Sequence, residues 1–153
     1  MSGTGPRPLG PSLDQRRALH AARAVQGLRP SEANRSGLRL YRAYVDRLGP
    51  TVLVNGLGQA LAMELASAGA GEDDPHRRLA DKLGEWLSDP PDGVLGPTDA
   101  PAGTSRGAAA LARLCEVDQR TYARAQAEAL AWLSWHKRLV RAVTGAGYEP
   151  PAD

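Results

Sequence analysis

Three histidines are the residues with which this chain could perform acid–base or metal chemistry. Hydrolysis of RNA needs an acid and a base beside one phosphate, and a metal site needs clustered ligands. His136 falls between Leu133 and Val140 on the apolar side of a helical pattern, where a hydrogen-bonded core histidine is expected. His20 lies in a basic row and His76 in a first helical turn, each without a partner at metal-ligand spacing. The pattern therefore predicts neither a catalytic centre nor a metal site.

Acidic and glycine-rich segments give no cofactor site either. The pair Asp73-Asp74 is typical of a helix cap, and the aspartates of residues 88–107 lack the spacing of a calcium-binding loop. The glycine segment 56–60 lacks the preceding strand and the phosphate-facing turn of a dinucleotide-binding motif, and its pattern places it inside a helix. We therefore expect no cofactor.

Arginine supplies nearly all of the positive charge, since Lys82 and Lys137 are the only lysines, yet the formal net charge is only +2. The planar guanidinium suits phosphate recognition. An arginine bias also arises from a GC-rich genome, and the lack of Phe and Ile in an alanine-rich chain is consistent with that cause. The position of the arginines, rather than their number, has to decide between these explanations.

Helical phasing places these cations in outward rows on three expected helices. Such rows can follow a phosphate backbone, although a single charged row is usually only a solvated surface. Asp46 and Glu128 lie near two of the rows and leave salt bridges to neighbouring subunits open as an alternative. The rows consist of Arg16, His20 and Arg23; of Arg35, Arg39 and Arg42; and of Arg120, Arg124 and Arg138 with Arg141 beside them.

The elements that carry these rows are all expected to be helices, because no strand-like alternation occurs. We predict an all-α fold, a single-domain bundle of five to six helices. Gly49-Pro50 is expected to end the second helix, and the third, with apolar residues all round its axis, should be central and buried. The expected helices span about 13–28, 31 or 36 to 48, 50–71, 75–87, 108–115 and 119–143.

Composition divides the chain into a helical core and less ordered segments. Residues 1–11 are predicted to be a disordered N-terminal tail, 12–145 the helical bundle with a flexible Pro/Gly-rich loop at 88–107, and 146–153 a C-terminal tail. The N-terminus lacks a secretion signal and no apolar run reaches spanning length. The single Cys115, in an apolar helical pattern, is predicted to be a buried thiol in a cytoplasmic protein.

Two further features predict contacts with other helices or chains. Gly56 and Gly58 each cost an expected helix about 1 kcal/mol relative to alanine, so close approach of another helix or of a partner chain is expected there. Asn55 and Gln59 could hydrogen-bond across that contact. Trp135 could stack on a base or anchor a protein interface, although half-buried packing is commoner. The candidate subunit-interface residues are Asn55, Gly56, Gly58, Gln59 and Trp135.

Two segments resemble a known family. Asn-Gly-Leu-Gly-Gln-Ala-Leu-Ala at 55–62 and Glu-Ala-Leu-Ala-Trp-Leu-Ser-Trp-His-Lys-Arg-Leu-Val at 128–140 resemble the small all-helical subunit of the type III-B CRISPR effector, the Cmr complex. Supporting matches lie at 41–45, 85–87 and 122–124, and the resemblance covers most of residues 13–142. The chain departs from the family pattern at His136, where an apolar residue is expected, and at Leu139-Val140.

The resemblance implies a non-catalytic small subunit in antiviral defence. Such a subunit stacks with copies of itself into a minor filament beside the other subunits and helps to seat guide RNA and target RNA, while cleavage and cyclic-nucleotide synthesis belong to other subunits. An alternative is a helical protein-interaction adaptor whose arginines pair with acidic partner surfaces, and an enzyme is the third possibility. The family's basic residues correspond best to Arg124, Lys137 and Arg138. The candidate RNA-binding residues are Arg16, Arg23, Arg35, Arg39, Arg42, Arg124, Lys137, Arg138 and Arg141.

Overall fold

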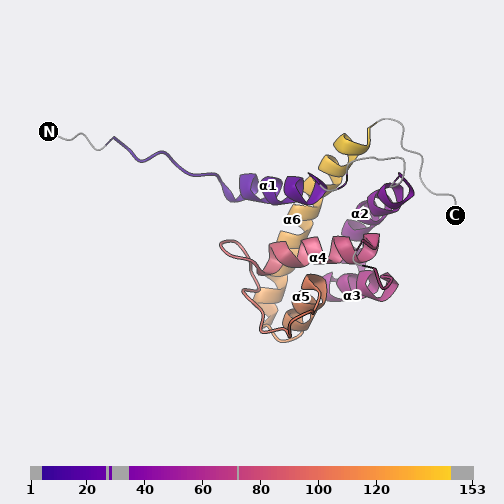
Figure 1. Ribbon diagram of the computed structural model, residues 1–153. Helices are drawn as coiled ribbons and strands as arrows, with labels where there is room; N and C mark the ends of the chain where they lie inside the picture. Colours follow the sequence, from indigo (N-terminus) through magenta and orange to yellow (C-terminus); the bar gives the residue numbers. More distant parts are fainter. Residues whose placement is uncertain (1–4, 27, 29–34, 72, 146–153) are drawn as a thin grey trace.

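The computed structural model describes residues 5–26, 28, 35–71 and 73–145 (Figure 1). Six helices and no strands occur among these residues, which confirms the predicted all-α single domain. None of the described helices is long and apolar enough to cross a bilayer. The helices are α1 (Leu13–Gln26), α2 (Arg35–Asn55), α3 (Leu57–Ser67), α4 (Pro75–Ser88), α5 (Arg106–Leu114) and α6 (Gln119–Thr144).

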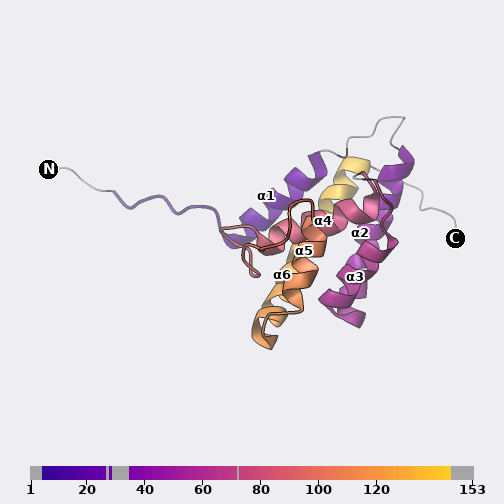
Figure 2. The ribbon, with the colours of Figure 1, turned by 60° about the horizontal axis from the view of Figure 1, so that its bottom comes forward.

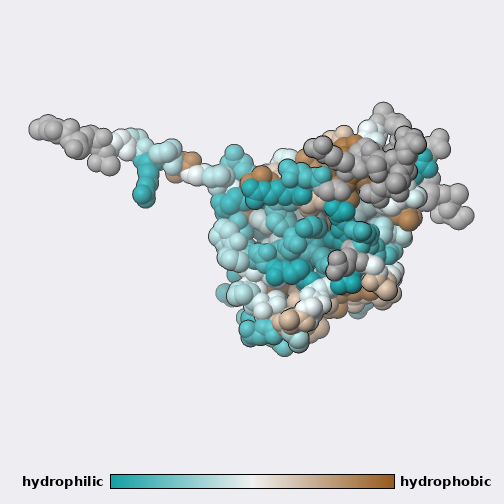
Figure 3. All heavy atoms as spheres, in the orientation of Figure 1, coloured by the Kyte–Doolittle hydropathy of each residue, from teal (hydrophilic) through white to brown (hydrophobic). Residues whose placement is uncertain are grey.

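The long C-terminal helix α6 and the central helix α4 are the two elements on which the others pack. Helices α1 and α2 both pack along α6, α4 packs on α5, and α3 lies against α2, α4 and α5 (Figures 1 and 2). The core between them contains Trp132 and Tyr41, both fully buried, together with leucines from several helices. Hydrophilic side chains cover much of α1 and α4 on the face that Figure 3 shows.

Local capping begins three of the helices where the sequence predicts. Ser12 and Gln15 form a reciprocal capping box at the start of α1, with hydrogen bonds of 2.7 and 3.2 Å. The side chain of Asp74 accepts from the Arg77 amide at the start of α4, and that of Asp118 accepts from the Thr121 amide at the start of α6. These termini depend on residues within one turn of the chain, which is why sequence patterns locate them.

The second helix does not end at Gly49-Pro50, so that prediction is wrong. Helix α2 continues through Pro50 to Asn55. Its buried residues follow one helical stripe across the proline, and Thr51 supports the turn by donating from Oγ1 to the Arg47 carbonyl at 2.9 Å. Burial along a continuous stripe therefore outweighs the hydrogen bond that proline cannot donate. The stripe consists of Tyr41, Val45, Leu48 and Val52.

The chain instead breaks at Gly56, whose φ of 84° lies in the left-handed region that glycine tolerates. The glycine segment is thus a junction between α2 and α3 rather than the interior of one helix. Helix α3 is also not buried all round, in contrast to the prediction. Its inner face contacts the core, while Met63 is 52% exposed and the preceding Leu53 and Val54 of α2 are 70% and 82% exposed.

Helices α4 and α5 approach each other at backbone contact distance. A Cβ atom added to Gly84 would lie 2.5 Å from the Arg106 carbonyl oxygen, and one added to Gly107 would lie 2.8 Å from Ala80. The Asp81 carboxylate accepts from the Gly107 amide at 2.9 Å. Glycine is required at both contacts because any side chain would separate the two helices.

The segment between α4 and α5 is attached to the bundle by several contacts. Asp92 forms an ion pair with Arg16, and the buried Leu95 donates its amide to the Leu87 carbonyl at 2.8 Å. Its flexibility stays a prediction, as does the disorder of the N-terminal tail, of which residues 5–11 are exposed and lack helix. The predicted tail at 146–153 lies outside the described residues.

Cys115 is exposed, so the prediction of a buried thiol is wrong. Helix α5 ends at Leu114, which takes the last core position, and Cys115 follows as the cap residue. The apolar pattern suggested one more buried position than the short helix provides.

Candidate nucleic-acid interface

The outward side of α6 carries Arg120, Arg124 and Arg138, which we call the basic face of α6. All three side chains are exposed and lie within about half a turn of one another around the helix axis. The opposite side of α6 is buried against the core and fixes this orientation. The residues between the arginines on the outward side are small, chiefly alanine and Ser134. The basic face is therefore an open surface with cations at its two ends.

The basic face is not neutralised by acidic side chains of the described residues. Arg120 and Arg124 form no ion pair with any of them, and neither does the half-buried Lys137 nearby. Arg138 donates from Nη1 to the Ser134 hydroxyl at 2.6 Å and to the Ser134 carbonyl at 3.3 Å, which leaves its charge uncompensated. These positive charges remain available to an anionic partner.

The second basic row, on α2, meets the C-terminal end of α6. Arg42 donates from Nη1 to the Thr144 hydroxyl at 2.8 Å, and Arg141 lies 3.4 Å from the Asp46 carboxylate. Arg39 is exposed on the same helix, whereas the side chain of Arg35 lies outside the described residues. The two rows thus adjoin, and Asp46 compensates the charge of Arg141 at their junction.

The row predicted on α1 is not a continuous strip of available cations. The Arg16 guanidinium donates to both oxygens of Asp92, at 2.8 and 2.9 Å, and to the Pro11 carbonyl at 2.6 Å. His20 accepts at Nδ1 from the Trp132 indole at 2.9 Å. Arg23 is exposed. Arg16 and His20 therefore serve contacts within the chain, and Arg23 is the exposed cation of this row.

Glu128, which the sequence placed near the α6 row, is instead part of an internal cluster. Its carboxylate accepts from Arg17 at 2.5 and 2.9 Å and from the Trp86 indole at 3.3 Å. This cluster joins α1, α4 and α6. Sequence reasoning did not single out Arg17, because its partner lies 111 residues away in the chain.

The glycine junction packs against α6 of the same chain. Tyr122 and Gln126 provide the acceptors for the first amides of α3: the Gly58 amide donates to the Tyr122 hydroxyl at 2.7 Å, and the Leu57 amide donates to Gln126 Oε1 at 3.0 Å. A Cβ atom on Gly58 would lie 3.1 Å from that hydroxyl oxygen. The sequence predicted that another helix or a partner chain approaches these glycines closely. In the structure the approaching element is another helix of the same chain, α6.

The remaining candidate interface residues are Asn55, Gln59 and Trp135. Asn55 and Gln59 are exposed, as are Leu53 and Val54 near the end of α2 and Met63, one turn beyond Gln59 on α3; we call these five residues the α2–α3 corner. Trp135 is half-buried, and its indole nitrogen donates to the Asp14 carboxylate of α1 at 3.0 Å. The polar group of Trp135 is therefore used within the chain, while the α2–α3 corner presents apolar surface to solvent.

The three histidines serve structural contacts. The fully buried His136 lies between the Ala21 carbonyl, 3.2 Å from Nδ1, and the Tyr41 hydroxyl, 2.5 Å from Nε2, and it stacks on Trp132. Burial lowers the pKa of His136 to about 3, so the ring is neutral and the Tyr41 hydroxyl donates to it. This confirms the expected core histidine.

His76 forms a second buried contact. Its Nδ1 lies 2.6 Å from the Glu64 carboxylate, and its ring stacks on Tyr44. His20 and His136 are tied to Trp132 instead, so the histidines do not converge on one site. No group of three or more potential metal ligands occurs in the described part of the chain.

Comparison with known proteins identifies the family. No curated protein matches the chain significantly. A family model described as CRISPR-associated protein (Cas_Cmr5) matches residues 13–143, from the first residue of α1 almost to the end of α6. The matched region contains the glycine junction, the Glu128 cluster and the basic face of α6. The chain therefore belongs to the CRISPR-associated Cmr5 family, the small subunits of type III-B CRISPR (Cmr) complexes.

Proposed function

We propose that this chain is a non-catalytic subunit of a cytoplasmic type III-B effector complex and contacts guide or target RNA through the basic face of α6. The single observation that carries this proposal is the uncompensated charge of Arg120, Arg124 and Arg138 on one open side of a helix. Arginine forks bind phosphates bidentately, and the family acts in RNA-guided complexes.

The dimensions of the basic face support an RNA strand as its partner. Arg120 and Arg138 are separated by 18 residues of helix, which corresponds to about 27 Å. That length spans several phosphates of a strand. The small side chains between the arginines allow a sugar–phosphate backbone to approach α6 closely, and Arg39 and Arg42 of α2 extend the basic surface beyond Arg141.

We further propose that copies of the subunit stack through the α2–α3 corner into a minor filament. The corner exposes Leu53, Val54 and Met63 beside the amides of Asn55 and Gln59. Exposed apolar side chains with polar groups beside them are typical of protein interfaces. The corner and the basic face lie on different elements, so one subunit can contact both a neighbouring copy and RNA.

The test is charge reversal of the basic face in the assembled complex. The variant Arg120→Glu/Arg124→Glu/Arg138→Glu should weaken target-RNA binding at least about tenfold and lower the salt slope of log K by roughly 2, because each lost phosphate contact to a single strand contributes about 0.7. Circular dichroism should remain helical. The matched control Arg7→Glu/Arg47→Glu/Arg77→Glu changes net charge equally at other places. Unchanged affinity and salt slope in the first variant would overturn RNA contact at this face.

A protein-interaction adaptor is the second candidate, favoured by the ion pairs that Arg16 and Arg141 form with carboxylates. On this view the basic face binds acidic surfaces of other subunits. Co-purification separates the candidates. If the charge-reversed variant no longer assembles with the other subunits in RNA-free preparations, the face is a protein interface.

A further inference from the structure

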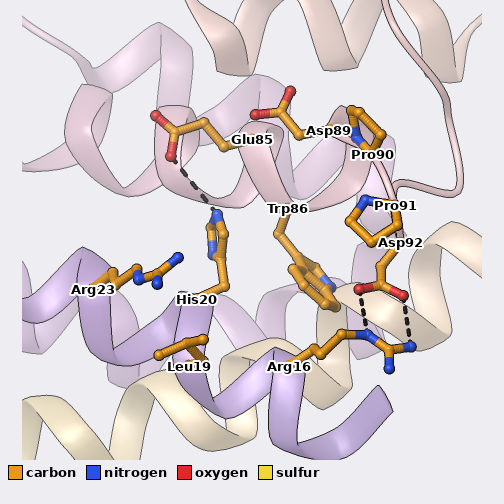
Figure 4. Close-up of a pocket in the computed structure, with 10 residues that line it drawn as sticks. All are labelled: Arg16, Leu19, His20, Arg23, Glu85, Trp86, Asp89, Pro90, Pro91 and Asp92. Carbon is orange, nitrogen blue, oxygen red and sulfur yellow. Dashed lines mark hydrogen bonds and ion pairs between the residues drawn. The ribbon is translucent and has the colours of Figure 1, made fainter. Parts of the chain in front are cut away.

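A separate cleft lies between α1 and α4, where the Pro90-Pro91 turn closes one end (Figure 4). Its volume is about 200 Å³. Sites that enclose a whole small molecule usually measure about 300–1,000 Å³, so this cleft is of a size for one ring system rather than a complete nucleotide. None of the structural contacts described above fills it.

The apolar part of the cleft consists of the largely buried Trp86, the half-exposed Leu19 and the two prolines. In Figure 4 Trp86 lies between His20 and the Arg16–Asp92 ion pair. The indole N–H of Trp86 is donated to Glu128, outside the cleft. Trp86 is only 6% exposed, so Leu19 and the prolines supply most of the apolar surface, which suits an aromatic ring.

Two polar groups of the cleft, the donor Arg23 and the acceptor Glu85, are not held in a pair between oppositely charged side chains across the cleft. Arg16 binds both oxygens of Asp92, and Asp89 pairs with Arg106. His20 accepts at Nδ1 from Trp132, so its N–H is on Nε2, 3.7 Å from the Glu85 carboxylate. Glu85 has capacity for further donors beyond His20 and Lys82, and the exposed Arg23 lies on the other side of His20 (Figure 4).

This charge arrangement leaves one group of each sign. Arg16 is paired with Asp92 and Asp89 with Arg106, so Glu85 and Arg23 are the acceptor and the donor that the cleft offers to a ligand. A neutral flat ring with donors on one edge and acceptors on another can bind both the Glu85 carboxylate and the Arg23 guanidinium. Guanine is such a ring, because its N1–H and N2–H groups suit a carboxylate while O6 and N7 suit an arginine fork.

We infer that the α1–α4 cleft binds one unpaired guanine base of RNA, with Glu85 accepting from the base and Arg23 donating to it. This inference rests on the proposed RNA-binding function. Sequence-specific recognition of RNA generally uses unstacked bases held by stacking and edge hydrogen bonds. The base would enter while its phosphates stay at the mouth, beside the exposed Arg23.

The test compares two short oligouridylates that differ only in one central base, guanosine or adenosine, by fluorescence anisotropy with the full chain. The guanosine oligomer should bind about fivefold to tenfold more tightly. Glu85→Gln should remove this preference, whereas Glu116→Gln, the same change at an exposed glutamate outside the cleft, should retain it. The Trp86 indole signal, one of three in a ¹⁵N spectrum, should shift with guanosine monophosphate but not with adenosine monophosphate.

Failure of the cleft and failure of the RNA proposal are distinguishable. Charge reversal of the basic face should weaken both oligomers equally and leave the guanine preference intact. Equal binding of the two oligomers, or a guanine preference that survives Glu85→Gln, overturns guanine recognition in the cleft. Neither result contradicts RNA contact at the basic face of α6. If neither oligomer binds but guanosine monophosphate shifts the Trp86 signal, guanine binding in the cleft is supported and RNA contact at the basic face of α6 is overturned. If neither oligomer nor mononucleotide binds, both proposals are overturned.

Discussion

The hydroxyl oxygen of Tyr122 accepts a hydrogen bond from the backbone amide of Gly58 at a distance of 2.7 Å. This contact joins the first turn of α3 to α6 and, together with Gln126, provides acceptors for amides that a helix N-terminus leaves without partners. A Cβ atom at Gly58 would lie 3.1 Å from this hydroxyl oxygen, so glycine leaves room for the contact. The contact also orients α6, since the buried Tyr122 side determines that the basic face is directed outward.

Tyr122→Phe should therefore destabilise the fold. The substitution removes the acceptor of a partly buried amide, and the expected loss in the free energy of unfolding is about 1–2 kcal/mol. Urea denaturation measures this loss. Tyr44→Phe is the matched control, because the Tyr44 ring stacks on His76 and its hydroxyl makes no hydrogen bond with the described residues. Equal stability of the two variants would contradict a role for the Tyr122–Gly58 bond.

Removal of the Glu128 carboxylate should be more costly. In Glu128→Ala the Arg17 guanidinium and the Trp86 indole lose their shared acceptor, and the two charged side chains of the pair are only 18% and 15% exposed. We expect a loss of about 2–3 kcal/mol, somewhat below the range for fully buried pairs. Glu116→Ala breaks the exposed pair with Arg113 and should cost less than about 1 kcal/mol. A comparable loss in both variants would argue against the internal cluster.

The approach of α4 to α5 predicts different effects for two Gly→Ala substitutions. Gly84→Ala inserts a Cβ atom 2.5 Å from the Arg106 carbonyl oxygen and should lower the thermal midpoint, with a cost of about 1–3 kcal/mol. Gly49→Ala in the interior of α2 should change stability by less than about 1 kcal/mol, because the helix propensity of alanine offsets the crowding of a Cβ atom before Pro50. Calorimetry of both variants compares the two effects, and a stabilised Gly84→Ala would disprove the close contact.

Burial of His136 predicts a loss of stability in mild acid. Because the pKa of His136 is lowered to about 3 in the fold, the unfolded chain takes up a proton below about pH 6.5 that the folded chain does not. Stability should fall with decreasing pH across this window, by at most about 1.4 kcal/mol per unit from this residue. Burial also lowers the pKa of His20, which adds a change of the same sign.

The comparison of His136→Gln with the parent chain isolates the contribution of His136. Glutamine cannot titrate, so the urea midpoint of this variant should depend less steeply on pH between 6.5 and 4 than the midpoint of the parent chain. Parallel pH dependences would show that His136 is not responsible. The imidazole signals of His136 in the parent chain provide a second measure and should not titrate above pH 5.

For the basic rows, the sequence predicts which arginines are exposed but not which of them are paired with carboxylates. Helical phasing correctly placed Arg124 and Arg138 on the exposed side of α6, because the period of an α-helix fixes which residues share a side. It also placed Arg16 outward, but could not show that Asp92, 76 residues away, binds its guanidinium. Whether an outward arginine is available to a ligand depends on acids that arrive from other elements.

The α2–α3 region shows the same limit for the fold. Proline and glycine rules predicted a break at Gly49-Pro50, yet the break lies at Gly56. The rules describe local cost, about 3 kcal/mol for proline in a helix interior. They do not include the burial of Val52 on the far side of the proline, which only the packed structure supplies.

The sequence alone thus determined the helical class, the capped starts of α1, α4 and α6, and the core position of His136, because periodicity and capping depend on residues within a few positions of one another. Tertiary structure decided that α2 passes through Pro50, that Tyr122 meets Gly58 across 64 residues, and which arginines are already paired. Those outcomes depend on packing and ion pairs between distant segments, and each is stabilised only when the whole bundle forms.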